Sequence, residues 1–201
     1  MNKRVLYGIA AVVLLLAGAA ALTRAQAQSG QAQPPERWLH VRVEEFGNGG
    51  ELVRVNLPLS VAEKVLPAVK VKKLQNGKIK LNHIRIEDVD LRAVLEAVRD
   101  GADGEYVTVE SKRKNGTVRV AKKAGYLVVE VREQKEGVES ERVDVTMPMV
   151  LVDALLSGAN DEIDLLAAIR VLRTLGDTEL VKVKDKRNTV RVWVDSKNTA
   201  E

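Results

Sequence analysis

The stretch Val53-Arg54-Val55-Asn56-Leu57-Pro58-Leu59-Ser60 (VRVNLPLS) runs from a strand-like pattern into a proline. Valine and leucine alternate with polar residues up to Leu57, as in a β-strand with one buried face. Pro58 has no N–H to donate to a sheet, but its fixed φ suits the first turn of a helix. The stretch therefore predicts a strand that ends where a helix begins. The same junction returns in the segment 143–150 (VDVTMPMV), with Pro148 in the place of Pro58.

Three further stretches occur twice, in the same order along the chain. The pairs are WLHVRVE (38–44) with YLVVEVR (126–132), LRAVLEAVR (91–99) with LLAAIRVLR (165–173), and TVRV at both 117–120 and 189–192. Self-similarity in a fixed order indicates an internal repeat. We therefore predict two modules, 37–124 and 125–196, followed by a short tail, 197–201.

Each half has the same predicted elements. Two alternating strands around a glycine-containing turn suggest a hairpin. A short helix, a longer helix with an apolar stripe and a second hairpin follow. Ser60 and Glu63 fit a capping box at the first helix. The predicted fold class is α+β: two tandem ββααββ repeats, each an antiparallel sheet with helices packed on one face. The pattern leaves open whether the two sheets lie side by side or join edge to edge.

The first 27 residues have the order of a secretory signal. Lys3 and Arg4 precede an apolar run, 5–22, and the triplet Ala25-Gln26-Ala27 supplies a small-x-small cleavage site. We predict cleavage after this triplet and export to the periplasm or the cell exterior. The alternative is an uncleaved inner-membrane anchor, because the apolar run is close to the lower length limit for a span.

The charge balance after signal removal argues against a nucleic-acid partner. The whole chain has a net charge of +4, but the predicted signal contains three basic residues, and the remainder has 29 basic and 28 acidic residues. The two signs are interspersed, whereas nucleic-acid binders concentrate basic residues on one surface. The chain has no cysteine, so it forms no disulfide and no cysteine-based metal site. The polar segment 28–36 contains two prolines and is predicted to be a tether.

The residue types for catalysis are sparse. The two histidines, His40 and His83, have no metal-site or triad spacing around them, and we expect both to be exposed to solvent. Acidic clusters, 87–90 and 161–164, precede the longer helix in each half. Helix capping explains these clusters, and calcium binding or acid–base chemistry is the alternative. We therefore predict no enzyme activity, no metal and no cofactor.

The segment 70–81 is present only in the first half. Asn76-Gly77 between two alternating arms predicts a hairpin with a type I′ turn. The hairpin would place four lysines on one face: Lys70, Lys72, Lys78 and Lys80. These lysines either discourage edge pairing as solvated charges or dock the protein on an anionic polymer or membrane surface.

Aromatic residues are rare, and four of them alternate to the face opposite the predicted core: Trp38, Tyr106, Tyr126 and Trp193. All four lie near strand ends that are distant from the hairpin turns. A group of exposed aromatic side chains suggests a binding surface. The alternative is that the two halves pack against each other through these residues.

Four motifs resemble an uncharacterised bacterial module: WLHVRV (38–43), VRVNLPLS (53–60), DLRAVLEAV (90–98) and YVTVES (106–111). The second half departs more, since VTMPMV lacks the serine. The resemblance implies the ββααββ arrangement and an envelope setting, because such modules are often found beside SHOCT-like helical segments and adhesin-like domains. It brings no catalytic residues.

These observations together predict an exported, non-enzymatic interaction or sensor module of the bacterial cell envelope. The expected partner is an envelope protein or polymer. The alternative is a structural protein of the envelope that self-associates through its sheet edges.

Overall fold

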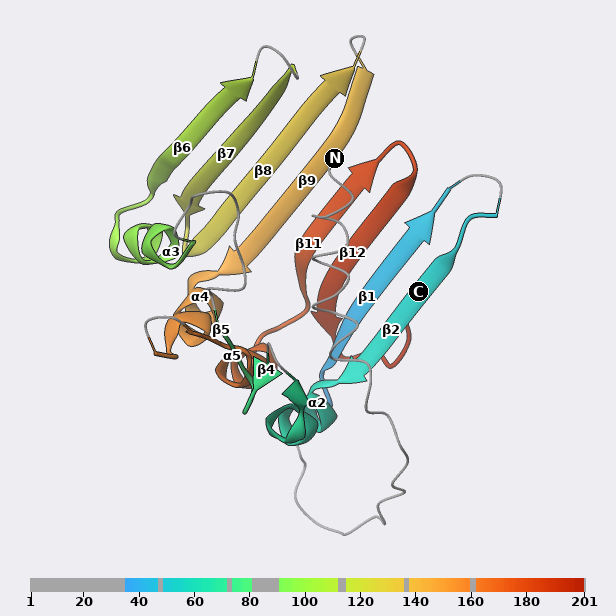
Figure 1. Cartoon of the computed structure of the whole chain (residues 1–201), viewed down its shortest axis with the longest axis vertical. Coiled ribbons are helices and arrows are strands. Elements are labelled where there is room, and N and C mark those ends of the chain that lie inside the picture. Colours follow the sequence, from blue (N-terminus) through green and yellow to red (C-terminus); the bar gives the residue numbers. More distant parts are fainter. Residues whose placement is uncertain are drawn as a thin grey trace.

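Figure 1 shows a computed structural model of the chain, which describes residues 35–46, 49–71, 74–80, 91–111, 115–135, 138–159 and 162–200. Several predictions concern residues outside these ranges. The segments and residues concerned are the signal peptide, most of the tether, His83, Lys72 and the first acidic cluster, 87–90.

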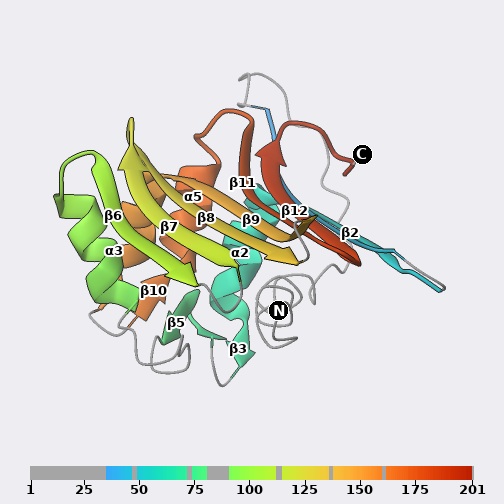
Figure 2. The ribbon, with the colours of Figure 1, turned by 90° about the horizontal axis from the view of Figure 1, so that it is seen from above.

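One eight-stranded antiparallel sheet dominates the fold (Figure 1). Its strands lie in the order β2-β1-β12-β11-β9-β8-β7-β6. Their bounds are β1 Trp38–Glu45, β2 Leu52–Pro58, β6 Gly104–Ser111, β7 Gly116–Lys123, β8 Tyr126–Lys135, β9 Val138–Pro148, β11 Thr178–Asp185 and β12 Asn188–Asp195. Seen from above, the strands turn progressively from β6 to β2, which is the usual twist of a sheet (Figure 2).

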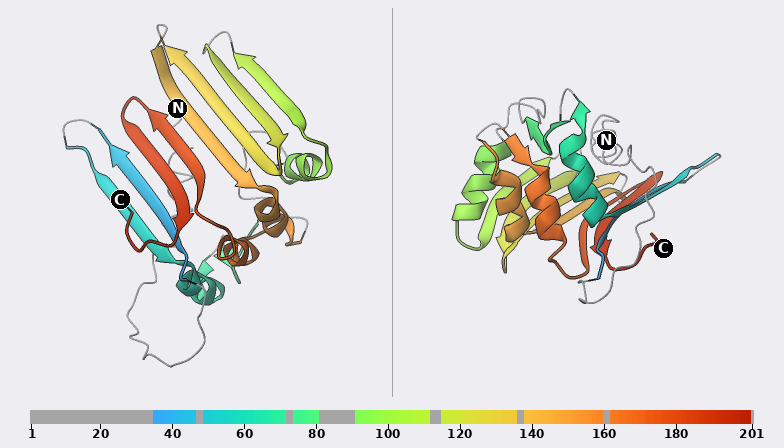
Figure 3. Two further views of the ribbon diagram at one scale, coloured as in Figure 1. Left: turned by 180° about the vertical axis from the view of Figure 1, so that it is seen from behind. Right: turned by 90° about the horizontal axis from the view of Figure 1, so that it is seen from below.

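The helices of the described residues form a row, α2-α5-α4-α3, along one end of the sheet (Figures 1 and 3). Their bounds are α2 Leu59–Val65, α3 Leu91–Asp100, α4 Met149–Leu156 and α5 Leu165–Leu172, and a short 3-10 helix, η1 Leu66–Ala68, follows α2. A buried cluster joins the row to the strands and includes Leu59, Ile169 and Val194. None of these helices is long and apolar enough to cross a bilayer.

The prediction of two tandem ββααββ repeats, each with its own helix-covered sheet, is wrong. β1 pairs with β12, at the other end of the chain, and β7 pairs with β8. The turn between β7 and β8 is only Ala124-Gly125, and both residues have positive φ. A hairpin turn of this length forces the flanking strands to be neighbours in one sheet. The strands of both halves therefore share one sheet, and the short helices lie along its end.

The two proline junctions have the same geometry. Pro58 ends β2 and stands before α2, and Pro148 ends β9 and stands before α4, both with extended backbone. The next N–H after each proline bonds across the sheet end: Leu59 N donates to the Arg37 carbonyl at 2.8 Å and Met149 N to the Gly125 carbonyl at 2.9 Å. The prediction of a strand that ends where a helix begins is confirmed at both places.

The predicted capping box at α2 is wrong. The backbone N–H of Ser60 donates to the carboxylate of Glu36 at 3.1 Å. Glu63 binds Arg170, at 2.9 Å, and Arg173, which follows α5. These two guanidinium groups hold the pKa of Glu63 below its usual value. Glu63 therefore joins two helices of the row instead of closing the start of its own.

The inserted hairpin belongs to a second, small sheet of order β10-β5-β4-β3. The bounds are β3 Lys70–Val71, β4 Leu74–Gln75, β5 Lys78–Lys80 and β10 Glu162–Asp164. Asn76 and Gly77 have φ of +51° and +77°, so the predicted type I′ turn is confirmed. The Gly77 carbonyl accepts the Leu165 N–H at 2.9 Å, and Leu74 and Ile79 are buried. The hairpin is therefore packed against the start of α5.

We expect Gly77→Ala to destabilise the protein much more than Gly49→Ala. Both glycines have left-handed φ, +77° and +83°. A Cβ on Gly77 would lie 2.9 Å from the Leu166 Cβ, whereas a Cβ on Gly49 would meet nothing within 4 Å. Gly49→Ala should lower the free energy of unfolding by about 1 kcal/mol and Gly77→Ala by about 3 kcal/mol. Urea denaturation measures both, and equal losses would contradict the packing of the hairpin.

Candidate functional site

A buried polar cluster lies on the sheet face opposite the helices. His40, in the middle of β1, stands between Asn56 of β2 and Trp193 of β12 in the register of the sheet. Side chains alternate in a strand, so His40 lies opposite the core residue Val41, which packs towards the helices. His40 is 0% exposed. The expectation that His40 is exposed to solvent is therefore wrong.

Both ring nitrogens of His40 have partners inside the protein. Nδ1 lies 2.7 Å from Asn56 Oδ1, and Nε2 lies 3.0 Å from both Asp195 Oδ1 and the Lys197 carbonyl oxygen. Nε2 faces two oxygen acceptors and therefore carries a hydrogen. Since both nitrogens are engaged and the ring is covered, His40 is not placed to act on a substrate.

Trp193 covers the histidine ring from β12. The two rings stack with centroids 4.9 Å apart, and the indole N–H donates to Asp195 Oδ2 at 2.9 Å. The Arg191 guanidinium lies over the indole, 4.4 Å from its centre, and also pairs with Glu179. Trp193 is 5% exposed, so this tryptophan is part of an internal contact.

Asp195 connects the cluster to the C-terminal segment 196–200. Its Oδ1 also accepts the Lys197 backbone N–H at 2.7 Å, and Ala200 is buried. Burial raises the pKa of Asp195, but the hydrogen bonds from Lys197 and Trp193 and the contact with His40 outweigh it, and the pKa lies below its usual value. The cluster therefore fastens the end of the chain to the outer face of the sheet.

A shallow pocket beside this cluster is lined by Asp177, Glu179, Arg191, Trp193, Asp195 and Lys197, among others. The pocket mixes both charge signs, and its arginine and its aspartates are already paired with other side chains. No group of three or more histidine, aspartate or glutamate side chains suited to a metal lies within the described ranges. We find in this pocket no arrangement of nucleophile and base.

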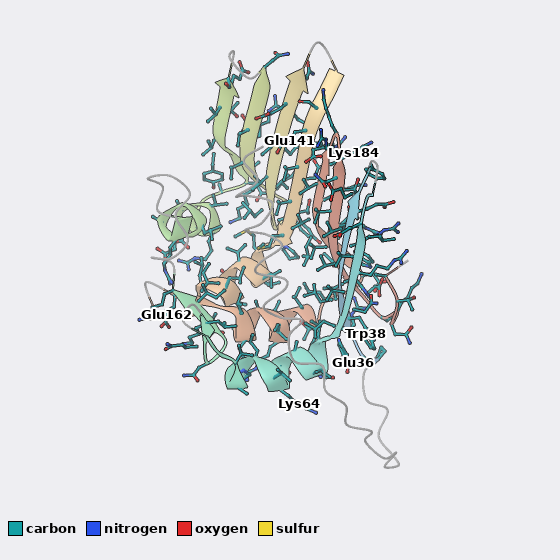
Figure 4. The ribbon with its side chains drawn as sticks, turned by 45° about the vertical axis from the view of Figure 1, so that its right-hand side comes forward. Glu36, Trp38, Lys64, Glu141, Glu162 and Lys184 are labelled. Carbon is teal, nitrogen blue, oxygen red and sulfur yellow. The ribbon has the colours of Figure 1, made fainter. Side chains whose placement is uncertain are left out.

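The structure does not bring the four predicted aromatic residues together. Trp38 faces Asp195 across β1 and β12 and lies near the helix end of the sheet (Figure 4), whereas Trp193 faces His40. Tyr126 and Tyr106 are exposed on β8 and β6, in the other half of the sheet. The Tyr106 hydroxyl donates to the Ala102 carbonyl, next to the end of α3. The four residues therefore do not form the single surface that the alternation indicated. Binding by them stays a prediction.

The lysine hairpin has acidic neighbours that the sequence did not indicate. β10 pairs with β5, so Glu162 faces Lys80 and Asp164 faces Lys78. The Lys78 ammonium lies 3.8 Å from Glu162 and 3.9 Å from Asp164 (Figure 4 labels Glu162). The Lys70 side chain and all of Lys72 fall outside the described part of the chain. Docking on an anionic surface stays a prediction, and the two carboxylates weaken it.

The second acidic cluster caps a helix, as predicted. Asp164 precedes α5, and its carboxylate accepts the N–H of Ala167 at 2.8 Å. This bond satisfies a backbone donor at the helix start and places negative charge at the positive end of the helix dipole.

The two open edges of the sheet are the candidate site that sequence patterning did not locate. β2 and β6 are the outermost strands (Figures 1 and 3). We call Leu52 and Val53 the β2 edge, and Val107 and Val109 the β6 edge; all four side chains are exposed. An edge strand presents unpaired N–H and C=O groups to any chain that can add a strand. In the sequence these valines look like those of central strands, because alternation does not reveal where a sheet ends.

We expect Asp195→Asn to destabilise the protein at neutral pH but not in acid. Its depressed pKa means that the carboxylate stabilises the fold above the unfolded-chain value of about 4, and that this stabilisation is lost as pH falls through the folded pKa. The substitution should lower the free energy of unfolding by about 2 kcal/mol at pH 7. The difference in free energy of unfolding between wild type and the variant should become smaller below about pH 4.

Urea denaturation at several pH values, followed by tryptophan fluorescence, measures this gap. Asp153→Asn, at an exposed position on α4, is the matched control and should change the stability by less than about 0.5 kcal/mol. A gap that stays constant or widens in acid would show that the Asp195 charge does not stabilise the cluster.

Comparison with known proteins gives one family match. Residues 37–121 match the model of the C-terminal domain of YvlB-like proteins, an uncharacterised bacterial domain. Neither a curated protein nor a solved structure has significant similarity to the chain. The matched range runs from β1 into β7, so the first part of this chain is similar to that domain.

Proposed function

We propose that the chain is an exported, non-enzymatic interaction module of the bacterial cell envelope that binds its partner by adding a strand to an open edge of its sheet. One observation carries this proposal: the sheet ends on both sides in strands with exposed apolar side chains. Strand addition is a common mode of protein recognition, in which backbone hydrogen bonds supply affinity and alternate side chains supply specificity.

The segments 52–57 of β2 and 107–110 of β6 lack most of the features that usually prevent strand addition, whereas Pro58 ends β2 and an irregularity lies at Glu105/Val107 in β6. Proteins protect open edges with prolines, lysines, or charged side chains that point towards the core side. From Leu52 to Leu57, β2 contains no proline and no lysine, and Arg54 is its single charge. In β6 the core-side residues Val107 and Val109 are apolar. An incoming strand would therefore meet neither steric nor electrostatic obstruction at these positions.

Other observations support the proposed envelope location and the proposed non-enzymatic role. The N-terminal sequence has the basic, apolar and small-x-small order of a secretory signal. The first part of the chain is similar to an uncharacterised bacterial domain. His40, the one histidine in the described ranges, has both nitrogens engaged. The partner class that fits these observations is an envelope protein or polymer.

We expect a lysine at either edge to abolish partner binding. Val53→Lys or Val109→Lys would place a charge on the core side of the edge, where an added strand would bury it. Val150→Lys is the matched control, because Val150 is also an exposed valine but lies on α4. Pull-downs from the envelope fraction with the three variants measure the effect. Retention of the same partners by both edge variants would exclude the edges as the binding site.

We expect an alkaline phosphatase fused after Glu201 to be active, because the enzyme folds only where its disulfides form, outside the cytoplasm. Substitution of Leu14 and Leu15 by arginine interrupts the apolar run and should abolish this activity. An inactive fusion of the unmodified chain, at equal protein level, would contradict export and leave the edge proposal to be judged by the pull-downs.

A further inference from the structure

We propose that the strand added at the edge comes from a second copy of this chain: β6 of one copy pairs with β2 of the next, antiparallel, in the register that β11 and β9 use within the chain. This inference rests on the proposed role of the open edges and names their partner. The internal pairing of β11 with β9 supplies the template.

The sheet consists of two four-strand blocks, β2-β1-β12-β11 and β9-β8-β7-β6, with equivalent pairings. The proline junctions of β2 and β9 have the same hydrogen bonds, as described above. The last pair of each block has the same irregularity, at Glu179/Val181 in β11 and at Glu105/Val107 in β6. In this correspondence β9 takes the position of β2, and β6 takes the position of β11.

The two blocks meet where β11 pairs with β9. The facing residues there include Val181 with Val145, Lys182 with Asp144, and Val183 with Val143 (Figure 4 labels Lys184 and Glu141 on these two strands). The same register can be applied to the two free edges, with β6 in place of β11 and β2 in place of β9. It sets Val107 opposite Val55, Thr108 opposite Arg54, Val109 opposite Val53 and Glu110 opposite Leu52.

Equivalent residues are covered at the internal junction and uncovered at the edges. Val183 of β11 is 1% exposed, whereas Val109, its counterpart in β6, is 52% exposed. The helix row has the same contrast. Leu151 of α4 is 3% exposed and shares a buried cluster with α5, whereas its counterpart Val61 of α2 is 39% exposed. The free edges therefore lack in both layers the neighbour that the internal junction has.

The charges of the two edges are complementary in this register. Glu110 and Arg54 would be diagonal neighbours on the polar face, within reach of an ion pair. At the internal junction Lys182 and Asp144 occupy facing positions on the same face, with opposite charges. Pairing of two copies would thus repeat the apolar contacts of the internal junction, with the diagonal Glu110 and Arg54 in place of the facing Lys182 and Asp144.

A contact between two different edges is not self-complementary, so it cannot form a two-fold dimer. Each copy that joins by its β2 edge leaves its β6 edge free for the next copy. The expected product is therefore a series of oligomers, linear or closed into a ring, and a two-fold dimer is not expected.

Disulfide cross-linking tests the register, because the chain has no cysteine of its own. A purified Val53→Cys chain is mixed with a purified Val109→Cys chain, both full length in mild detergent, and a mild oxidant is added. Directly facing residues of an antiparallel pair have Cα atoms about 4.5–5.5 Å apart, within the range of a disulfide. We expect a mixed dimer from this pair, and equally from Val55→Cys mixed with Val107→Cys.

The matched control mixes Val53→Cys with Val107→Cys, which are two residues out of register. Their Cα atoms would lie more than about 7 Å apart, too far to be bridged, so the dimer should be lost. Equal cross-linking of the in-register and out-of-register pairs would overturn the proposed register. Dimers of Val53→Cys alone would also overturn it, since they require two β2 strands to pair.

Light scattering of the cysteine-free chain provides the second measurement. Wild type and Val150→Lys should increase in mass with concentration, and Val109→Lys should stay monomeric with an unchanged circular dichroism spectrum. A monomeric wild type at every concentration would overturn self-association. In that case the pull-downs decide the proposed edge-binding function separately. If Val109→Lys failed to retain an envelope protein that wild type retains, binding at the edge would stand, with that other protein as the partner.

Discussion

The turn at Ala124-Gly125 is the constraint on which the arrangement of the sheet depends. A two-residue turn in which both residues have positive φ makes β7 and β8 antiparallel neighbours. The hairpins on either side then complete a block, β9-β8-β7-β6. The first and last hairpins of the chain pair with each other as β1 against β12. The short turn in mid-chain and the pairing of the first and last hairpins together place the eight strands in one sheet.

The polar cluster around His40 follows from that pairing. His40, Asn56 and Trp193 come from three strands that are adjacent only because β1 pairs with β12, and Asp195 then fixes the C-terminal segment over them. A buried polar group costs free energy unless its hydrogen bonds are satisfied, and here each ring nitrogen of the histidine is paired. The cluster stabilises the pairing of β1 with β12. The open edges, which no part of the described chain covers, are the surface that we propose for binding.

Sequence patterning located the elements well but not their partners. The strand–proline–helix junctions at Pro58 and Pro148, the type I′ turn at Asn76-Gly77 and the cap at Asp164 were predictable, because each depends on residues within one turn of the chain. The capping box failed because Glu63 has two arginines from a distant segment as stronger partners. His40 was misjudged because alternation gives the face of a strand and not what covers that face.

The amino-acid sequence by itself determined the local structure of this protein: where strands end, which residues turn the chain and which side of each strand is apolar. These properties follow from φ, from missing N–H groups and from a periodicity of two, all of which act over a few residues. Only the tertiary structure decided which hairpins pair, that both halves share one sheet, and which valines lie at its edges. Backbone hydrogen bonds between strands are the same for every sequence, so the choice of neighbours depends on turn length and on the whole set of available strands.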